Sequence, residues 1–161
     1  MLTIIVNMKL YLIQHGKSLS KDIDAGRPLS PEGEKEVKQI AKFLQHARVE
    51  VKSILHSGKI RAHQTAEILS EALFCEDSVI TIKGINPNDS VEEFAHTLDN
   101  FKHDTMIVGH LPFMARMVSF LVTGHEEPPL ISYKQGSVVC LEKDENHNWL
   151  IQWMVRPDNL G

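Results

Sequence analysis

The chain has 161 residues, the usual length of one domain, and 42% of them are hydrophobic, enough for a core that needs no disulfide staple. Its formal charge of −4 lacks the basic excess of a protein that binds nucleic acid or an anionic membrane, so we expect neither partner. Cys75 and Cys140 form no CxxC pair, which argues against a disulfide scaffold or zinc module and fits a reducing, cytoplasmic compartment. We expect a single domain over residues 1–161.

The opening stretch, residues 1–8, is apolar but is interrupted by Thr3 and Asn7, and no basic region precedes it. It is too short to span a bilayer and matches a signal peptide poorly. The patterned sequence starts at Lys9, so residues 1–8 can be an N-terminal extension and Met8 can be the true start.

From Lys9 onward, short apolar runs alternate with segments of helical periodicity. Two helix starts carry clear local signals: Ser30 is an N-cap before Pro31 at the first helical position, and Ser90 can cap a later helix. The predicted elements are a strand at 9–14, a helix from 31 through 44, a strand at 53–57, a helix at 60–73, a short strand at 79–82, a helix from 91 through 101, a strand at 105–108 and a helix at 112–122.

The last third of the chain changes character. Residues 136–142 and 149–155 predict a strand pair joined by the polar turn 144–148. Alternating strands and helices favour a mostly parallel sheet, and the late pair favours an antiparallel addition. The expected fold is therefore α/β, a three-layer sandwich with helices on both faces of the sheet and an antiparallel strand pair near the C-terminus.

Three of the predicted strands lead into chemically reactive residues. His15 follows the first strand, Ser57 ends the second, and His110 follows the strand at 105–108. In open α/β sheets the ligand site lies outside the carboxyl ends of the strands, so we expect these side chains at one edge. Arg61 lies in the first turn of a predicted helix, where backbone N–H groups favour an anion. The other histidines show no metal-binding spacing, and we expect neither a metal nor another cofactor.

Five motifs occur in a fixed order along the chain. They are Ile13-Gln14-His15-Gly16-Lys17, Arg27-Pro28-Leu29-Ser30-Pro31-Glu32-Gly33, Ser57 with Arg61-Ala62-His63-Gln64-Thr65-Ala66, Val108-Gly109-His110-Leu111-Pro112, and the ending from Trp149 to Trp153 with Pro157 and Leu160. Their order and intervals resemble the histidine phosphatase superfamily, in particular its SixA-type phosphohistidine phosphatase branch. The resemblance covers nearly the whole chain from Lys9.

The resemblance implies roles for the residues that match. His15 corresponds to the nucleophile, a neutral imidazole that attacks phosphorus and forms a transient phosphohistidine. Arg61 corresponds to the phosphate clamp, and His110 to the second histidine of the pocket. Gly16 leaves room for phosphate beside the backbone. Ser57 can donate a further hydrogen bond to phosphate, or it can simply cap the following helix.

The first motif departs from the family pattern. Where the family carries Arg-His-Gly, this chain has Gln14, which can still contact phosphate but removes a charge and a bidentate contact. The loss of such a contact costs roughly 1.5–3 kcal/mol, or one to two orders of magnitude in rate. Lys17 can restore some charge or lie in solvent. Arg27 can contact phosphate or have a plain surface role.

A general acid is also missing from the matched pattern. Asp89 is the nearest acid in the stretch after the second helix, and it can equally be a helix cap beside Ser90. The P–N bond of phosphohistidine is labile and its nitrogen can take a proton from water. The missing acid therefore favours phosphohistidine over a sugar phosphate as substrate.

The sequence thus predicts a metal-independent phosphatase that removes phosphate from a histidine on a partner protein, such as a phosphorelay domain. The reaction would pass through a covalent phosphohistidine at His15. Two alternatives stay open. One is a phosphoryl-binding regulatory protein in which Gln14 has weakened or silenced turnover, and the other is a small-molecule phosphomonoesterase.

Overall fold

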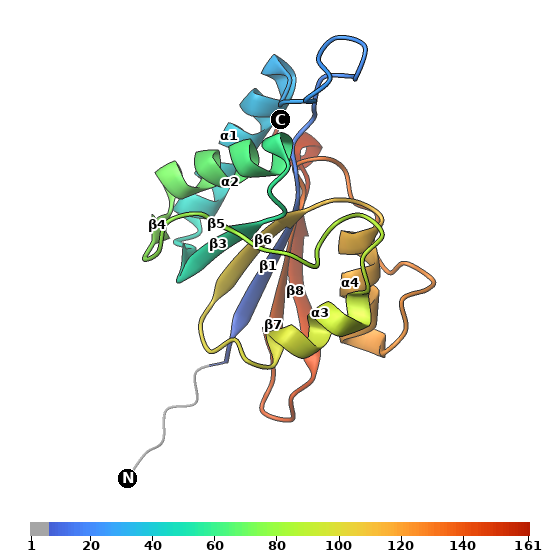
Figure 1. Ribbon diagram of the computed structural model, residues 1–161. Helices are drawn as coiled ribbons and strands as arrows, with labels where there is room; N and C mark the ends of the chain where they lie inside the picture. The colour runs from blue at the N-terminus through green and yellow to red at the C-terminus, as the bar shows by residue number, and fades with distance from the viewer. Residues whose placement is uncertain (1–6) are drawn as a thin grey trace.

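The computed structural model describes residues 7–161, so residues 1–6 of the expected N-terminal extension lie outside the described part (Figure 1). Its main feature is a six-stranded sheet with the strand order β5-β3-β6-β1-β7-β8. Neighbours among the first four strands pair in parallel, and β7 pairs antiparallel with both β1 and β8. The strands are β1 (Lys9–Gln14), β3 (Ser53–His56), β5 (Ile80–Thr81), β6 (Thr105–Gly109), β7 (Val138–Lys143) and β8 (Trp149–Val155).

Helices cover both faces of this sheet (Figure 1). One pair packs on one face and a second pair on the other, with a hydrophobic core beneath each. The first pair is α1 (Pro31–His46) and α2 (Ile60–Ala72), and the second is α3 (Val91–Leu98) and α4 (Phe113–Thr123). The predicted α/β fold, with a mostly parallel sheet and a late antiparallel pair, is confirmed.

The central strand β1 shows why its sequence is a continuous apolar run. Tyr11 and Ile13 belong to the core under α1 and α2, whereas Leu10 and Leu12 belong to the core under α3 and α4. Successive side chains of a strand point to opposite faces, and both faces are covered here. Every position from 10 to 14 is consequently buried.

The start of α1 follows its local signals. The Ser30 hydroxyl accepts a hydrogen bond from the backbone N–H of Gly33 at 3.0 Å, and Pro31 occupies the first turn. Gly33 is needed for a close approach, because a Cβ there would lie 2.0 Å from the carbonyl oxygen of Lys17. The helix start thereby packs directly on the segment that follows β1.

Some elements differ from the predicted ones. A second, two-stranded parallel sheet joins β2 (Glu50–Val51) and β4 (Phe74–Cys75), and η1 (Pro157–Leu160) is a short 3-10 helix. Two residues are too few to show a period, so the sequence pattern missed β2 and β4. The α3 helix ends at Leu98, earlier than predicted, because Phe101 donates instead to the carbonyl of Leu98 in a tighter turn.

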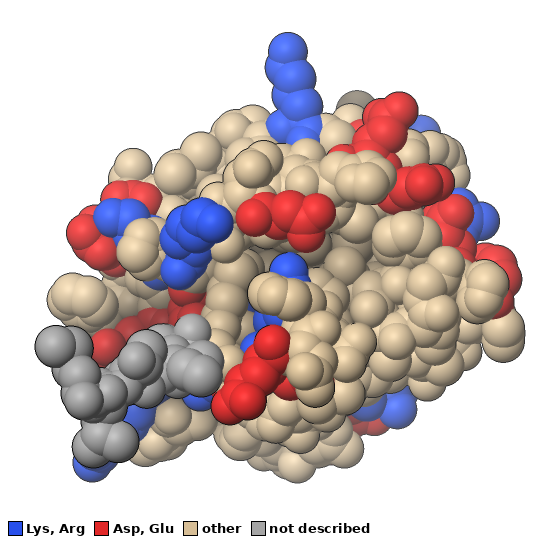
Figure 2. Space-filling view, turned by 90° about the horizontal axis from the view of Figure 1, so that it is seen from below, with Lys and Arg blue, Asp and Glu red and all other residues tan. Residues whose placement is uncertain are grey.

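Within residues 7–161, every helix is too short or too polar to span a bilayer. Figure 2 shows the face at the end of the sheet opposite to the candidate site. Basic and acidic side chains are intermixed over this face, without a large area of one sign.

Candidate active site

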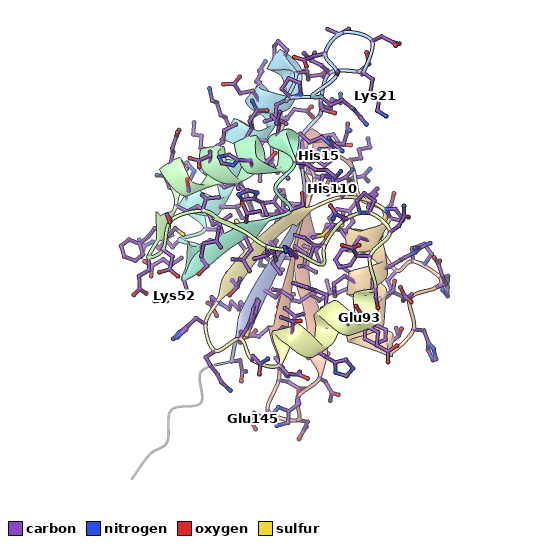
Figure 3. All side chains as sticks on the ribbon, viewed as in Figure 1. His15, Lys21, Lys52, Glu93, His110 and Glu145 are labelled. Carbon is purple, nitrogen blue, oxygen red and sulfur yellow. The ribbon has the colours of Figure 1, made fainter. Side chains whose placement is uncertain are left out.

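The register of the sheet brings two histidines together. Gln14 of β1 pairs with Gly109 of β6, so His15 and His110 are the next residues on two neighbouring parallel strands. Their ring centroids lie 4.9 Å apart, with the ring planes at 51°. Figure 3 shows both side chains side by side at the upper end of the sheet, below the loop that carries Lys21. His15 and His110 therefore lie together at one edge of the sheet, as the sequence predicted.

A hydrogen bond determines the tautomer of His15. Its Nδ1 donates to the carbonyl oxygen of Gly16 at 2.7 Å, which leaves Nε2 with the free lone pair of a neutral ring. Burial, together with the nearby charges of Arg61 and Arg27, lowers the pKa of His15 to about 4, against the raising effect of the Gly16 bond. The imidazole is therefore neutral at pH 7 and can act as a nucleophile through Nε2.

His110 is held by the residue that follows β3. Its Nε2 and the hydroxyl oxygen of Ser57 share a hydrogen bond of 2.6 Å. Burial, with smaller effects of His15 and Arg61, lowers the pKa of His110 to about 3. The opposite ring nitrogen, Nδ1, is buried and finds no hydrogen-bond partner among residues 7–161. That nitrogen is available to a ligand.

Three basic side chains surround the histidine pair. Arg61, in the first turn of α2, has a buried Nε without a hydrogen-bond partner in the described part of the chain. Burial and the neighbouring Arg27 lower the pKa of Arg61. Within the described residues, the Arg27 guanidinium donates to uncharged oxygens, those of Leu19 and Ser18, at 3.4 and 3.3 Å.

The third cation is Lys59, whose charge also acts on His110. Within residues 7–161, Lys59, Arg27 and Arg61 form no ion pair with a carboxylate. Clustered cations with unused donors are the arrangement that binds a multiply charged anion such as phosphate.

The first turns of α2 hold this arrangement together. The Thr65 hydroxyl accepts from the backbone N–H of Gly16 at 3.0 Å and donates to the carbonyl of Arg61 at 2.8 Å. Gln64 accepts from the backbone N–H of Leu29 at 2.7 Å. Sequence reasoning assigned no roles to Thr65 and Gln64. Their spacing from Arg61 by three and four positions, which places them on one helix face, was the available signal.

Two residues proposed as phosphate contacts, Gln14 and Lys17, line a hollow beside the end of β1. The Lys17 ammonium pairs with Glu32 at 2.8 Å and lies 3.7 Å from Glu36, so it already faces carboxylates. Gly16 is buried between the strand end and α1, where a Cβ would lie 2.6 Å from Cγ2 of Val37. Close packing alone therefore requires glycine at this position.

The remaining candidate residues have structural partners. Asp89 accepts from the backbone N–H of Asn86 at 2.8 Å and so closes the turn before α3, while Ser90 caps that helix. His56 accepts from the backbone N–H of Gly58 at 3.1 Å. Across residues 7–161, no three His, Cys, Asp or Glu side chains are grouped so as to hold a metal ion.

Comparison with known proteins finds a family that this chain resembles. Residues 10–85 match the model of the histidine phosphatase superfamily (branch 1). Phosphohistidine phosphatase SixA of Escherichia coli (strain K12) is 27% identical over 158 residues, covering 95% of this chain and 96% of the relative. An uncharacterised protein of Picosynechococcus sp. is 28% identical over 165 residues, covering 92% and 99%.

Solved structures have the same fold. A structure of the protein histidine phosphatase SixA complexed with tungstate is 25% identical, with a TM-score of 0.82 over 96% of this chain and 100% of that one. The alpha-ribazole phosphatase of Shigella flexneri is 16% identical, with a TM-score of 0.76 over 93% and 97% of the two chains. The shared fold, the family match to the first half and the near full-length similarity to SixA agree with one another. The chain is therefore similar to the histidine phosphatase superfamily over residues 10–85 and to SixA over nearly its whole length.

Proposed function

We propose that this protein is a phosphohistidine phosphatase, which removes phosphate from a histidine of another protein through a covalent phosphohistidine at His15. The family match and the similarity to SixA support phosphatase activity. The single observation that carries the mechanism is the state of His15. Its ring is neutral, its Nδ1 is engaged by Gly16, and the charges that act on it come from Arg61 and Arg27, which form no ion pair with a carboxylate in residues 7–161.

In the first step, the lone pair of His15 Nε2 attacks phosphorus and a new N–P bond forms. The P–N bond of the substrate phosphohistidine breaks, and its electron pair returns to the substrate imidazole, which takes a proton from water. Arg61 and Arg27 bind the oxygens that carry the negative charge, and a planar guanidinium suits two oxygens at once. The existence of a SixA structure complexed with tungstate, a tetrahedral oxyanion, supports oxyanion binding by a protein of this fold.

His110 completes the oxyanion site. With Ser57 donating its hydroxyl proton to Nε2, the Nδ1–H of His110 is free to donate to a phosphoryl oxygen. In this tautomer the ring donates to phosphate without taking up a proton at pH 7, because the pKa of about 3 keeps it neutral. Ser57 thus acts as a positioning residue for His110.

In the second step, water attacks the phosphorus of phosphorylated His15. The N–P bond breaks, inorganic phosphate leaves, and the electron pair returns to Nε2 of His15 while the attacking water gives up its proton to solvent. No step passes through a metal ion, so we expect a chelator to leave the rate unchanged.

The substrate class follows from the leaving group. An alkoxide leaving group needs a proton at the moment of departure, and the carboxylate of Asp89 is occupied by the turn before α3. The nitrogen of phosphohistidine departs without such an acid. The geometry therefore supports a phosphohistidine substrate on a partner protein, for which a phosphorelay domain is the expected carrier.

The test compares a phosphohistidine-bearing phosphorelay domain with an aryl phosphate, both with chelator present. We expect phosphate release from the phosphorelay domain and trapping of 32P on His15 in acid-free quench, with slow turnover of the aryl phosphate. Tight phosphate binding without turnover would instead support the regulatory protein in which Gln14 weakens catalysis. Faster turnover of the aryl phosphate would support a small-molecule phosphomonoesterase.

A further inference from the structure

A second hollow lies beside the end of β1 and takes no part in the proposed reaction. Its volume is about 520 Å³, and its walls come from the end of β1, the start of α1, the segment before β7 and η1. Its lining includes Gln14, which immediately precedes His15, and Lys17, which follows His15 by two residues. A protein chain that presents a group to His15 therefore passes close to this hollow.

Two side chains that line the hollow each carry a buried oxygen atom that lacks a hydrogen-bond donor among the described residues. One is Oε1 of Gln14, a side chain that is only 6% exposed. The other is Oε1 of Glu36, which lies 3.7 Å from the Lys17 ammonium, beyond hydrogen-bond distance. Buried acceptors without donors are unfavourable, so a ligand that supplies N–H groups is stabilised here.

The charges of the hollow favour a cation. Among the lining side chains, three carboxylates face two ammonium groups. Glu32 holds Lys17 at 2.8 Å, and Asp158 holds Lys134 at 2.8 Å. Glu36 is the carboxylate left with the weakest pairing, and it is also the one with the unpartnered buried oxygen.

We propose that this hollow is a subsite for a guanidinium group, supplied by an arginine side chain of the phosphorylated partner protein. A planar guanidinium presents several N–H donors and can reach acceptors on two residues, whereas an ammonium is more strongly hydrated. The buried ring of Tyr133 forms part of the wall, fixed by its hydroxyl donating to the Leu12 carbonyl at 3.0 Å. Guanidinium groups pack well on such aromatic surfaces. The identity of the partner rests on the proposed function; the guanidinium site does not.

The first experiment titrates the whole protein with ethylguanidinium and follows the backbone amide resonances of residues 133–135. We expect a saturable shift, weaker binding of ethylammonium, and no saturable response to sodium chloride. Glu36→Gln removes the charge and should weaken ethylguanidinium binding roughly tenfold. Glu34→Gln, on the same helix but outside the hollow, is the matched control and should bind as the wild type does.

Two substitutions of Gln14 should change ethylguanidinium binding in opposite directions. Gln14→Glu keeps the acceptor and adds a negative charge, so it should tighten ethylguanidinium binding roughly tenfold. Gln14→Arg places a guanidinium in the hollow from within the chain and should abolish binding. A shift that does not saturate, or equal affinities in Glu36→Gln and Glu34→Gln, would overturn the subsite.

The second experiment tests the source of the guanidinium. Phosphohistidine peptides carrying arginine one to four residues from the phosphohistidine are compared with the same peptides carrying citrulline, which is uncharged and of similar shape. We expect one arginine position to raise kcat/KM roughly tenfold, and we expect Glu36→Gln but not Glu34→Gln to remove this advantage.

The outcomes separate this inference from the proposed function. Equal turnover of every arginine and citrulline pair would overturn the arginine of the partner as the occupant, while leaving the phosphatase intact. Ethylguanidinium binding that depends on Glu36, in a protein that hydrolyses none of the peptides, would refute the phosphatase and support the subsite.

Discussion

The end of β1 separates two sites of opposite character. Around His15 and His110, the buried atoms without partners include nitrogen donors, the Nε of Arg61 and the Nδ1 of His110. In the neighbouring hollow, the unpartnered buried atoms are oxygen acceptors, on Gln14 and Glu36. Unused donors among cations suit an anion, and unused acceptors beside excess carboxylate suit a cation.

The comparison shows how one strand can serve two ligands. Side chains alternate across a strand, so consecutive residues at its end can face different surroundings. His15 meets the basic side chains of α2 and of the loop before α1, whereas Gln14 meets the acidic start of α1. Two adjacent positions in the sequence therefore take part in sites of opposite charge preference.

The largest expected effect concerns the nucleophile. His15→Ala should reduce turnover of a phosphohistidine protein at least about a thousandfold, because it removes the nitrogen that forms the proposed covalent intermediate. The melting temperature should stay near that of the wild type, since the ring ends a strand and fills little of either core. Phosphate release at the wild-type rate in a folded His15→Ala protein would contradict covalent catalysis at this residue.

The next largest effects distinguish the two proposed sites, because each variant should weaken the binding of only one ligand. Arg61→Ala should weaken phosphate or tungstate binding roughly a hundredfold, because it removes a charged, bidentate donor from a buried position. Its binding of ethylguanidinium should not change. Glu36→Gln should show the reverse pattern. Calorimetric titration of both variants with both ligands checks this, and a variant that weakens both ligands equally would show that the two regions form one site.

The pH dependence of stability reports on the histidine pair. Burial lowers the pKa of His15 from 6.5 to about 4, so the unfolded chain takes up the proton first as the pH falls. The part of the free energy of unfolding that is linked to His15 is therefore fully present above pH 6.5 and is lost as the pH drops towards 4. At pH 5 the loss from His15 alone is roughly 2 kcal/mol by proton linkage.

Urea unfolding at pH 7.5 and pH 5 measures this loss, with His15→Ala as the comparison. The variant should lose less stability between the two pH values than the wild type does. If both proteins lost the same amount, the buried neutral state of His15 would be wrong.

The smallest expected effect tests whether the two sites communicate. On a phosphohistidine peptide without arginine, Gln14→Arg should raise kcat/KM roughly tenfold, because a third guanidinium, besides those of Arg61 and Arg27, adds positive charge close to the developing negative charge. A gain in kcat would indicate a contact that strengthens in the transition state, and a gain confined to KM would indicate ground-state binding. Steady-state kinetics decide between these, and an unchanged kcat/KM would show that the Gln14 side chain serves the hollow alone.

Local sequence signals predicted the elements that position the site. Ser30 and Pro31 marked the start of α1, and the apolar run before His15 marked β1 with the bounds that the structure has. These signals are readable because capping and strand burial involve neighbours in the sequence. The rule that ligands bind beyond the carboxyl ends of parallel strands then led to His15, Ser57 and His110 as residues of one edge.

By itself, then, the sequence determined the α/β alternation, the order of the motifs and the residue types available for chemistry. The tertiary structure alone decided which nitrogen of His15 is free, because that depends on where the Gly16 carbonyl lies. It also turned Lys17 towards Glu32 and placed Gln14 in a hollow with Glu36. These outcomes depend on sheet register and on packing between segments distant in sequence, for which a one-dimensional pattern carries no signal.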